Sequence, residues 1–199
     1  MDLAVILLTV LSLLSIANGA QYELTVLDEE IFSICPNSEP GTLDMNGLMD
    51  LSELKTSMNA EGITVSGNST LRWDIQLEDR VQMNVNLLYF DRGSWTPTVF
   101  SQVFKDFCKS MYDSSQLHYK YWSGHITNDV RNKCVSVPGT KMMYETYSLS
   151  MTAGSLGPLR EGSYKANIML RAYDLSGVER ATRICFEIKG DLFKIRKKR

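Results

Sequence analysis

Apolar and polar residues alternate most regularly over residues 81–89. Apolar side chains occupy every second position there, and Gln or Asn fills the first three positions between them. A period of two is typical of a β-strand with one buried face. Residues 91–94 contain a glycine and predict a tight turn. Similar patterns predict further half-buried strands over 71–77, 164–172 and 184–188.

The spacing of apolar residues changes after this turn. They follow the three-and-four spacing of one helix face at Phe100, Val103, Phe104, Phe107, Cys108 and Met111. Thr96 suits a helix N-cap, and Pro97 suits the first helical position. The sequence therefore predicts an amphipathic helix from Pro97 to Met111.

Four weaker patterns add strands over 22–27, 51–58, 63–65 and 140–151, whereas residues 28–47 look like loop. Together these elements predict a mainly β fold. We expect a β-sandwich or β-cup of about seven to eight antiparallel strands with one central amphipathic helix.

The two ends of the chain differ from its body. Residues 3–16 are almost wholly apolar and precede small residues, so we expect a signal peptide over 1–19 and a secreted, extracellular protein. An uncleaved anchor is the alternative, because no Lys or Arg precedes the apolar run. Residues 20–193 would form a single domain. Five of the six residues 194–199 are Lys or Arg; this tail is a solvated end, a processing site or a peripheral contact with anionic membranes.

The remaining sequence is acidic, since the whole chain has a net charge of −2 even with this tail. That balance disfavours nucleic-acid binding. Asn68 begins an Asn-Ser-Thr glycosylation sequon. The four cysteines imply two disulfides in a secreted chain, and three pairings are open. They are Cys35, Cys108, Cys134 and Cys185. Without a CxxC motif or a neighbouring His pair, we expect no metal site.

Catalytic motifs are absent from the sequence. His118 and His125 are the two histidines, and His125 is better explained by a surface or packing role than by general-base chemistry. We therefore predict a protein that is not an enzyme and uses no cofactor.

Adaptable apolar side chains are abundant: the chain has ten Met, nine Tyr and seven Phe. Two readings stay open, an ordinary packed core and a cavity for a hydrophobic ligand. If there is a cavity, we expect its lining to include Val85, Leu87, Tyr89, Phe100, Phe104 and Phe107, with Tyr147, Leu149, Ile168 and Leu170 on the facing wall.

Several segments together resemble one family. They are residues 62–68 (GITVSGN), 73–74 (WD), 91–100 (DRGSWTPTVF), 105–109 (KDFCK), 164–165 (YK) and 184–187 (ICFE). The chain resembles the CheB-type chemosensory proteins of insects, which are similar to the mammalian ganglioside activator protein and to lipid-recognition domains of the ML type. The resemblance implies a secreted β-cup that binds a lipid or long-chain hydrocarbon in gustatory or pheromone sensing.

We therefore expect a carrier of a hydrophobic small molecule or lipid that presents it to a chemosensory receptor or ion channel. The alternatives are an extracellular interaction module with a packed core, as a partner of a receptor or channel, and a lipid-presenting accessory of a hydrolase. For the cysteines we predict the pairs Cys35 with Cys185 and Cys108 with Cys134.

Overall fold

The structure is a computed structural model that describes residues 20–59, 62–155 and 159–195. The signal peptide predicted over residues 1–19 and the last four residues of the basic tail lie outside the described residues. The fold is mainly β, as predicted, and is built from two sheets that face each other.

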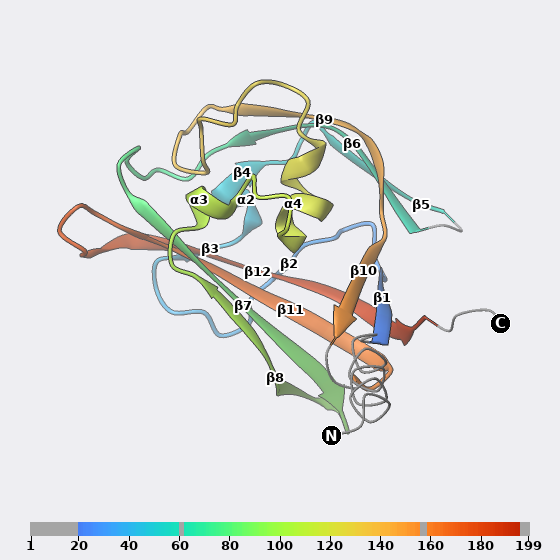
Figure 1. Ribbon diagram of the computed structural model, residues 1–199. Helices are drawn as coiled ribbons and strands as arrows, with labels where there is room; N and C mark the ends of the chain where they lie inside the picture. The colour runs from blue at the N-terminus through green and yellow to red at the C-terminus, as the bar shows by residue number, and fades with distance from the viewer. Residues whose placement is uncertain (1–19, 60–61, 156–158, 196–199) are drawn as a thin grey trace, which may run out of the picture.

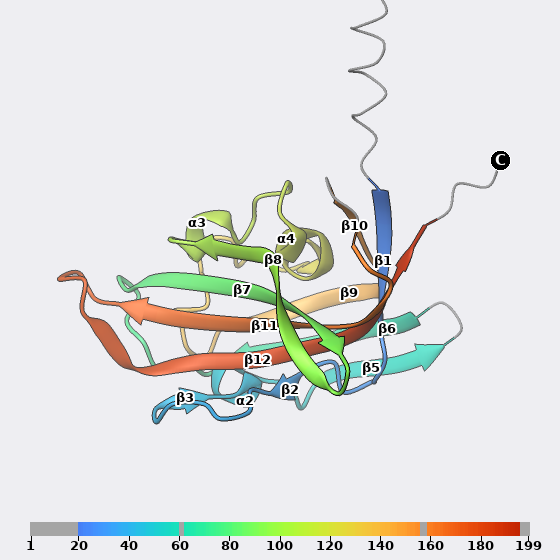
Figure 2. The same cartoon turned by 90° about the horizontal axis from the view of Figure 1, so that it is seen from below.

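The larger sheet contains the first strand and the last. Its strands are β1 (Ala20–Val26), β2 (Ser33–Ile34), β3 (Thr42–Leu43), β7 (Arg80–Asp91), β8 (Ser94–Phe104), β10 (Met151–Ser155), β11 (Gly162–Tyr173) and β12 (Glu179–Lys194). The order is β10-β1-β12-β11-β7-β8, and the short β2 and β3 also pair with β12. Every pair is antiparallel except β3 with β12. Figure 2 shows β7, β11 and β12 running side by side.

The smaller sheet is centred on one strand. Its members are β4 (Met49–Asp50), β5 (Leu54–Asn59), β6 (Gly62–Leu71) and β9 (Lys141–Leu149). The other three all pair with β6 in antiparallel register. Short helices complete the fold: α2 (Met45–Leu48), α3 (Phe107–Ser110), α4 (Leu117–Tyr121) and a 3-10 turn, η1 (Ser123–His125). Figure 1 places α3 and α4 between β6–β9 and β7–β11–β12 in that view.

The inner face of the larger sheet follows from the predicted alternation. In β7, Val81 and Met83 are buried, and the register places Val85 beside Ile168 of β11 and Ile168 beside Phe186 of β12. Side chains at successive partner positions form a row across one sheet face. Apolar residues of β7, β11 and β12 therefore form a continuous inner wall, and they pack in one cluster with residues of α2, α3 and β9.

The helix predicted from Pro97 to Met111 is wrong. Its first part is strand β8, and only Phe107–Ser110 is helical. Pro97 lies in an edge strand, where a missing backbone N–H is tolerated. The turn predicted at residues 91–94 is confirmed: β7 and β8 form a hairpin in which Arg92 and Gly93 have φ of 48° and 87°, as two-residue hairpin turns require.

The strand predicted over residues 71–77 is also wrong beyond its first residue. Leu71 ends β6, and the residues after it form no strand. Trp73 and Ile75 are nevertheless buried, at 0% and 4% exposure, whereas Leu77 is exposed. The backbone N–H groups of Arg72 and Trp73 both donate to the carbonyl of Leu48. An alternating burial pattern arises here from an irregular segment that is held against α2.

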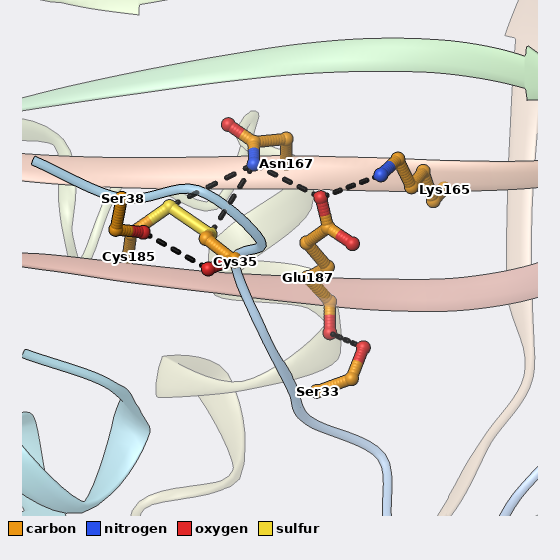
Figure 3. Close-up of a disulfide and its surroundings, with 7 residues drawn as sticks. All are labelled: Ser33, Cys35, Ser38, Lys165, Asn167, Cys185 and Glu187. Carbon is orange, nitrogen blue, oxygen red and sulfur yellow. Dashed lines mark hydrogen bonds and ion pairs between the residues drawn. A yellow bond between two sulfur atoms is a disulfide. The ribbon is translucent and has the colours of Figure 1, made fainter. Parts of the chain in front are cut away.

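The two predicted disulfides, Cys35–Cys185 and Cys108–Cys134, are confirmed. The first joins the loop after β2 to β12 across the outer face of the larger sheet (Figure 3). The second joins α3 to the irregular segment that precedes β9.

An ion pair lies beside the first disulfide, on the same outer face. Lys165 Nζ is 2.7 Å from Glu187 Oε1, and both side chains are less than one tenth exposed. Asn167 Nδ2 donates to the same carboxylate oxygen and also lies 3.3 Å from Cys35 Sγ (Figure 3). Lys165 Nζ is also 5.1 Å from the centre of the Trp95 ring. Buried charges require such compensation, so the arrangement serves the structure of the sheet.

Candidate functional site

The main feature of the interior is an apolar cavity of about 280 Å³ between the two sheets. The larger sheet contributes Met83, Val85, Ile168, Leu170 and Phe186 to its wall. These residues face inward because they occupy alternate positions of β7, β11 and β12. The cavity is therefore a product of the same alternation that forms the inner wall.

The opposite wall comes from the smaller sheet and the short helices. Strands β6 and β9 contribute Val65, Tyr144, Tyr147 and Leu149, and helices α2, α3 and α4 contribute Met45, Leu48, Phe107, Leu117, His118 and Tyr121. Among the described residues that line the cavity, none is Asp, Glu, Lys or Arg. The cavity can thus hold an apolar group, and it offers no full charge to a polar one.

Seven of the ten residues predicted to line an interior cavity do so. They are Val85, Phe104, Phe107, Tyr147, Leu149, Ile168 and Leu170. Leu87 and Tyr89 lie on the same face of β7, but further along the strand. There they pack in a separate cluster around Tyr22, Tyr164 and Leu192. Sequence alternation fixes the face of a residue but not the extent of a cavity along that face.

Phe100 does not line the cavity either and is 38% exposed. The register of β7 and β8 shifts here: Asn86 pairs with Ser101, whereas Leu88 pairs with Pro97. Three residues of β8 therefore lie opposite the single residue Leu87. Such a bulge re-aims the side chains within it. Thr98 Oγ1 stabilises the bulge by donating to the carbonyl of Leu87 and accepting from the N–H of Phe100.

Sequence reasoning missed the contribution of α2. Met45, Leu48 and Met49 have helical spacing, and Asp44 is the N-cap, with its carboxylate accepting from the N–H groups of Asn46 and Gly47. This signal is present in the sequence: its first part lies in residues 28–47, which were expected to be loop, and Leu48 and Met49 follow directly. The contributions of Tyr121 and Trp122 were also missed, although their aromatic cluster is evident in the sequence.

The tyrosine hydroxyls around the cavity already have partners. Tyr144 shares a hydrogen bond with Ser69 Oγ at 2.7 Å and accepts one from Trp122 Nε1 at 3.0 Å. The Tyr147 hydroxyl donates to the carbonyl of Tyr121. Burial raises the pKa of Tyr144 and of Tyr147, so both remain neutral. Their rings therefore act as neutral apolar walls.

The two histidines have different surroundings. His125 stacks on Tyr147, and its nitrogens face Glu145 Oε1 and the carbonyl of Lys120. It supports the wall from behind, as expected of a packing residue. His118 lines the cavity itself and contacts the rings of Phe104 and Phe107.

Burial lowers the pKa of His118 below its ordinary value. A hydrogen bond to the carbonyl of Ser110 and the charge of Asp113 act in the opposite direction. Because burial is the largest of these effects, the neutral imidazole is favoured at pH 7.

The part of the chain that the structure describes holds no group of three or more His, Cys, Asp and Glu side chains placed to bind a metal ion. None of its helices is both long and apolar enough to cross a bilayer.

Comparison with known proteins adds no relative. Neither the models of protein families nor the curated proteins contain a match to this chain.

Proposed function

We propose that the protein is a non-enzymatic carrier of a hydrophobic small molecule, either a lipid or a long-chain hydrocarbon. The observation that carries the proposal is the apolar cavity of about 280 Å³ between the sheets. Ligand pockets are typically concave and lined by hydrophobic and aromatic side chains. A fully packed protein core, by contrast, holds only voids close to the volume of a water molecule.

The volume of the cavity limits what it could hold. An apolar cavity of about 150 Å³ can hold benzene, and pockets for small ligands span roughly 300–1,000 Å³. A cavity of about 280 Å³ therefore suits one unbranched chain better than several. Met45, Met49 and Met83 lie in the wall, where unbranched side chains can adapt to ligands of different shape.

The extracellular location and the chemosensory role of the carrier are proposed on separate grounds. Two disulfides are typical of proteins that fold in an oxidising compartment, which supports secretion. The chemosensory role, with a taste or pheromone receptor or channel as partner, rests on the resemblance to CheB-type proteins.

A fluorescent fatty acyl probe tests the carrier function. We expect a saturable rise in fluorescence with the native protein and a loss of at least tenfold in affinity for Ile168→Phe, which adds a ring to the cavity wall. The matched control is Val99→Phe, because Val99 is 91% exposed on β8. The control should bind the probe as the native protein does.

Thermal unfolding of Ile168→Phe separates a carrier from a packed core. If the cavity has room for the ring, the melting temperature should stay the same or rise. In a tightly packed core the extra volume should cost about 1–3 kcal/mol. Loss of stability without probe binding by the native protein would reject the carrier.

The interaction-module alternative has one observation in its favour. Strand β8 is an edge of the larger sheet, and Val99 and Val103 on it are 91% and 55% exposed. An exposed apolar edge is a template for another strand. Under this alternative, the native protein should not bind the probe, and Val103→Lys should abolish partner binding.

A further inference from the structure

A polar side chain interrupts the apolar inner wall at its edge. The register aligns Gln102 of β8 with Val85, Val85 with Ile168, and Ile168 with Phe186. Gln102 is therefore the last member of a row of four inward-facing residues. It lines the cavity, is exposed, and has no hydrogen bond from its side chain among the described residues. Because Gln102 is both exposed and part of the lining, the cavity opens to solvent at this edge, which we call the mouth of the cavity.

His118 lines the same cavity and contacts Phe104, which shares a strand face with Gln102. Phe104 follows Gln102 by two positions, so both side chains project from one face of β8. The ring centres of Phe104 and His118 are 5.1 Å apart, and Leu117, which precedes His118 in α4, is 54% exposed. Gln102 and His118 are thus both neighbours of Phe104 in the cavity lining.

The hydrogen bonding of His118 determines what its free nitrogen can bind. Nε2 is 2.7 Å from the carbonyl oxygen of Ser110, and a carbonyl can only accept, so Nε2 carries a proton. In the neutral ring, Nδ1 then has a lone pair and no proton. No described residue donates to Nδ1. His118 therefore brings an unfilled acceptor to the cavity lining.

Other polar groups in the lining are already occupied. The hydroxyls of Tyr144 and Tyr147 are bonded to Ser69 and to the Tyr121 carbonyl, and Trp122 Nε1 donates to Tyr144. The hydroxyl of Tyr121 is bonded to the backbone of Thr152. Among the described cavity residues, the free hydrogen-bonding capacity is concentrated in Gln102 and His118.

We propose that Gln102 and His118 together bind the polar head of the ligand, and that this head is an uncharged hydrogen-bond donor, such as the hydroxyl of a long-chain alcohol. The inference rests on the proposed carrier function and names its ligand class. A hydroxyl donates to His118 Nδ1 and accepts from the Gln102 amide, while its chain enters the cavity. An alkane would cover both groups without bonding them, which carries a penalty.

A carboxylate fits the mouth less well than a hydroxyl. It has no proton to donate to Nδ1, and the described lining supplies no Lys or Arg to balance its charge. A methyl ester can accept from Gln102 but leaves Nδ1 unfilled. Gln102 and His118 should therefore distinguish ligands that have the same hydrocarbon chain but different head groups.

The experiment measures the affinity of the full chain for four probes by displacement of the fluorescent acyl probe. The four are a medium-chain primary alcohol, alkane, methyl ester and carboxylate of equal carbon number. We expect the alcohol to bind about tenfold more tightly than the methyl ester, which lacks one of its two hydrogen bonds, and more tightly still than the alkane, which lacks both. The carboxylate should also bind less tightly than the alcohol.

Gln102→Leu tests the contact directly and should fold, because Gln102 is exposed on an edge strand. This variant should lower the affinity for the alcohol by about tenfold and leave the affinity for the alkane unchanged. The matched control is Ser101→Leu, which places the same side chain on the opposite face of the same strand. His118→Phe, which keeps an aromatic ring beside Phe104 and Phe107, should abolish the preference for the alcohol over the methyl ester.

The outcomes separate this inference from the carrier function. Equal affinity for alcohol and alkane, or tightest binding of the carboxylate, would overturn the proposed head group and leave the carrier intact. Equal loss of alcohol affinity in Ser101→Leu and Gln102→Leu would also overturn it. Failure of all four probes, and of the acyl probe itself, would reject both.

Discussion

Lys165 Nζ lies 2.7 Å from Glu187 Oε1 on the outer face of the larger sheet, with both side chains buried. The pair is remote from the cavity, because Lys165 and Glu187 alternate with the inward-facing Ala166 and Phe186. Mutations of this ion pair should therefore change the stability of the protein without changing ligand binding.

We predict that Lys165→Met or Glu187→Leu lowers the free energy of unfolding by about 3–5 kcal/mol, because each leaves an unpaired buried charge. In the double variant, which removes both charges, the free energy of unfolding should fall by much less. Denaturant unfolding of the four proteins forms a double-mutant cycle that measures the difference. Additive losses would contradict a coupled pair.

Asp79 and Arg180 should make stability depend on pH in the acid range. Arg180 donates to both carboxylate oxygens of Asp79, at 2.7 Å and 2.9 Å. These hydrogen bonds lower the pKa of Asp79, against the opposing effect of its burial. A carboxyl whose pKa is lower in the folded state stabilises the fold above its unfolded pKa of about 4. That stabilisation is lost as the pH falls through the lowered folded pKa.

We therefore predict that Asp79→Asn destabilises the protein at neutral pH, and that the difference from the native protein shrinks as the pH falls below about 4. Urea unfolding across this range measures it. Asp74→Asn is the control, since Asp74 is an exposed carboxylate in the same irregular segment. A difference that does not vary with pH would argue against the ionisation of Asp79 as its cause.

We predict that Asn68 carries a glycan when the chain is expressed with passage through the secretory pathway. Its side chain projects from β6 on the side opposite the buried Ser69 and donates to Glu53 Oε2 at 3.1 Å. Asn68→Gln and Thr70→Ala both destroy the sequon, and Thr70→Ala keeps the Asn68 side chain. Both variants should migrate faster than the native protein in a gel. Unchanged mobility of either would show that Asn68 is unmodified.

The basic tail needs a corrected boundary. We expected it to begin at residue 194, but Lys194 is the last residue of β12, and the N–H of Ile195 donates to the carbonyl of Gln21. Deleting residues 196–199 should therefore leave the melting temperature nearly unchanged. Deleting 194–199 should lower it, because the pairing of β12 with β1 is shortened.

The shorter deletion also tests membrane association. Each Lys or Arg near an anionic surface contributes about 1 kcal/mol, screened over a Debye length of about 10 Å at 0.1 M salt. We predict weaker binding of the 196–199 deletion to anionic vesicles, most clearly at low salt. Equal binding by both proteins would identify the tail as a solvated end.

Sequence periodicity predicts a strand well where one face of it is buried and poorly where the strand is exposed and bulged. In β11 one face is buried along most of the strand, and in β7 the corresponding face is buried at Val81 and Met83 and half-buried from Val85 to Tyr89. The period of two is therefore clear in both strands, and the inner wall was predicted correctly. In β8 the bulge at Thr98 shifts the phase of the alternation, and apolar residues occupy both faces of an exposed edge strand. The resulting spacing imitates one face of a helix.

The cavity was harder to predict for a related reason. Ile168 and Tyr89 both satisfy the rule that inward-facing residues are apolar, but only Ile168 lines the cavity, while Tyr89 packs against Tyr164. Whether an inward-facing residue meets a neighbour or empty space depends on the separation of the sheets, which no local pattern encodes. Gln102 was missed because a polar residue in a presumed helix looks like part of its solvated side.

The long separation of Cys35 and Cys185 requires the two disulfides to form in a particular order during synthesis. Its cysteines are 150 residues apart in sequence, whereas Cys108 and Cys134 are separated by 26. At a synthesis rate of roughly 5–20 residues per second, Cys35 waits on the order of ten seconds or more for its partner. Cys108 and Cys134 both emerge during that interval. The native bridges form without later exchange only if these two cysteines find each other before either meets Cys35.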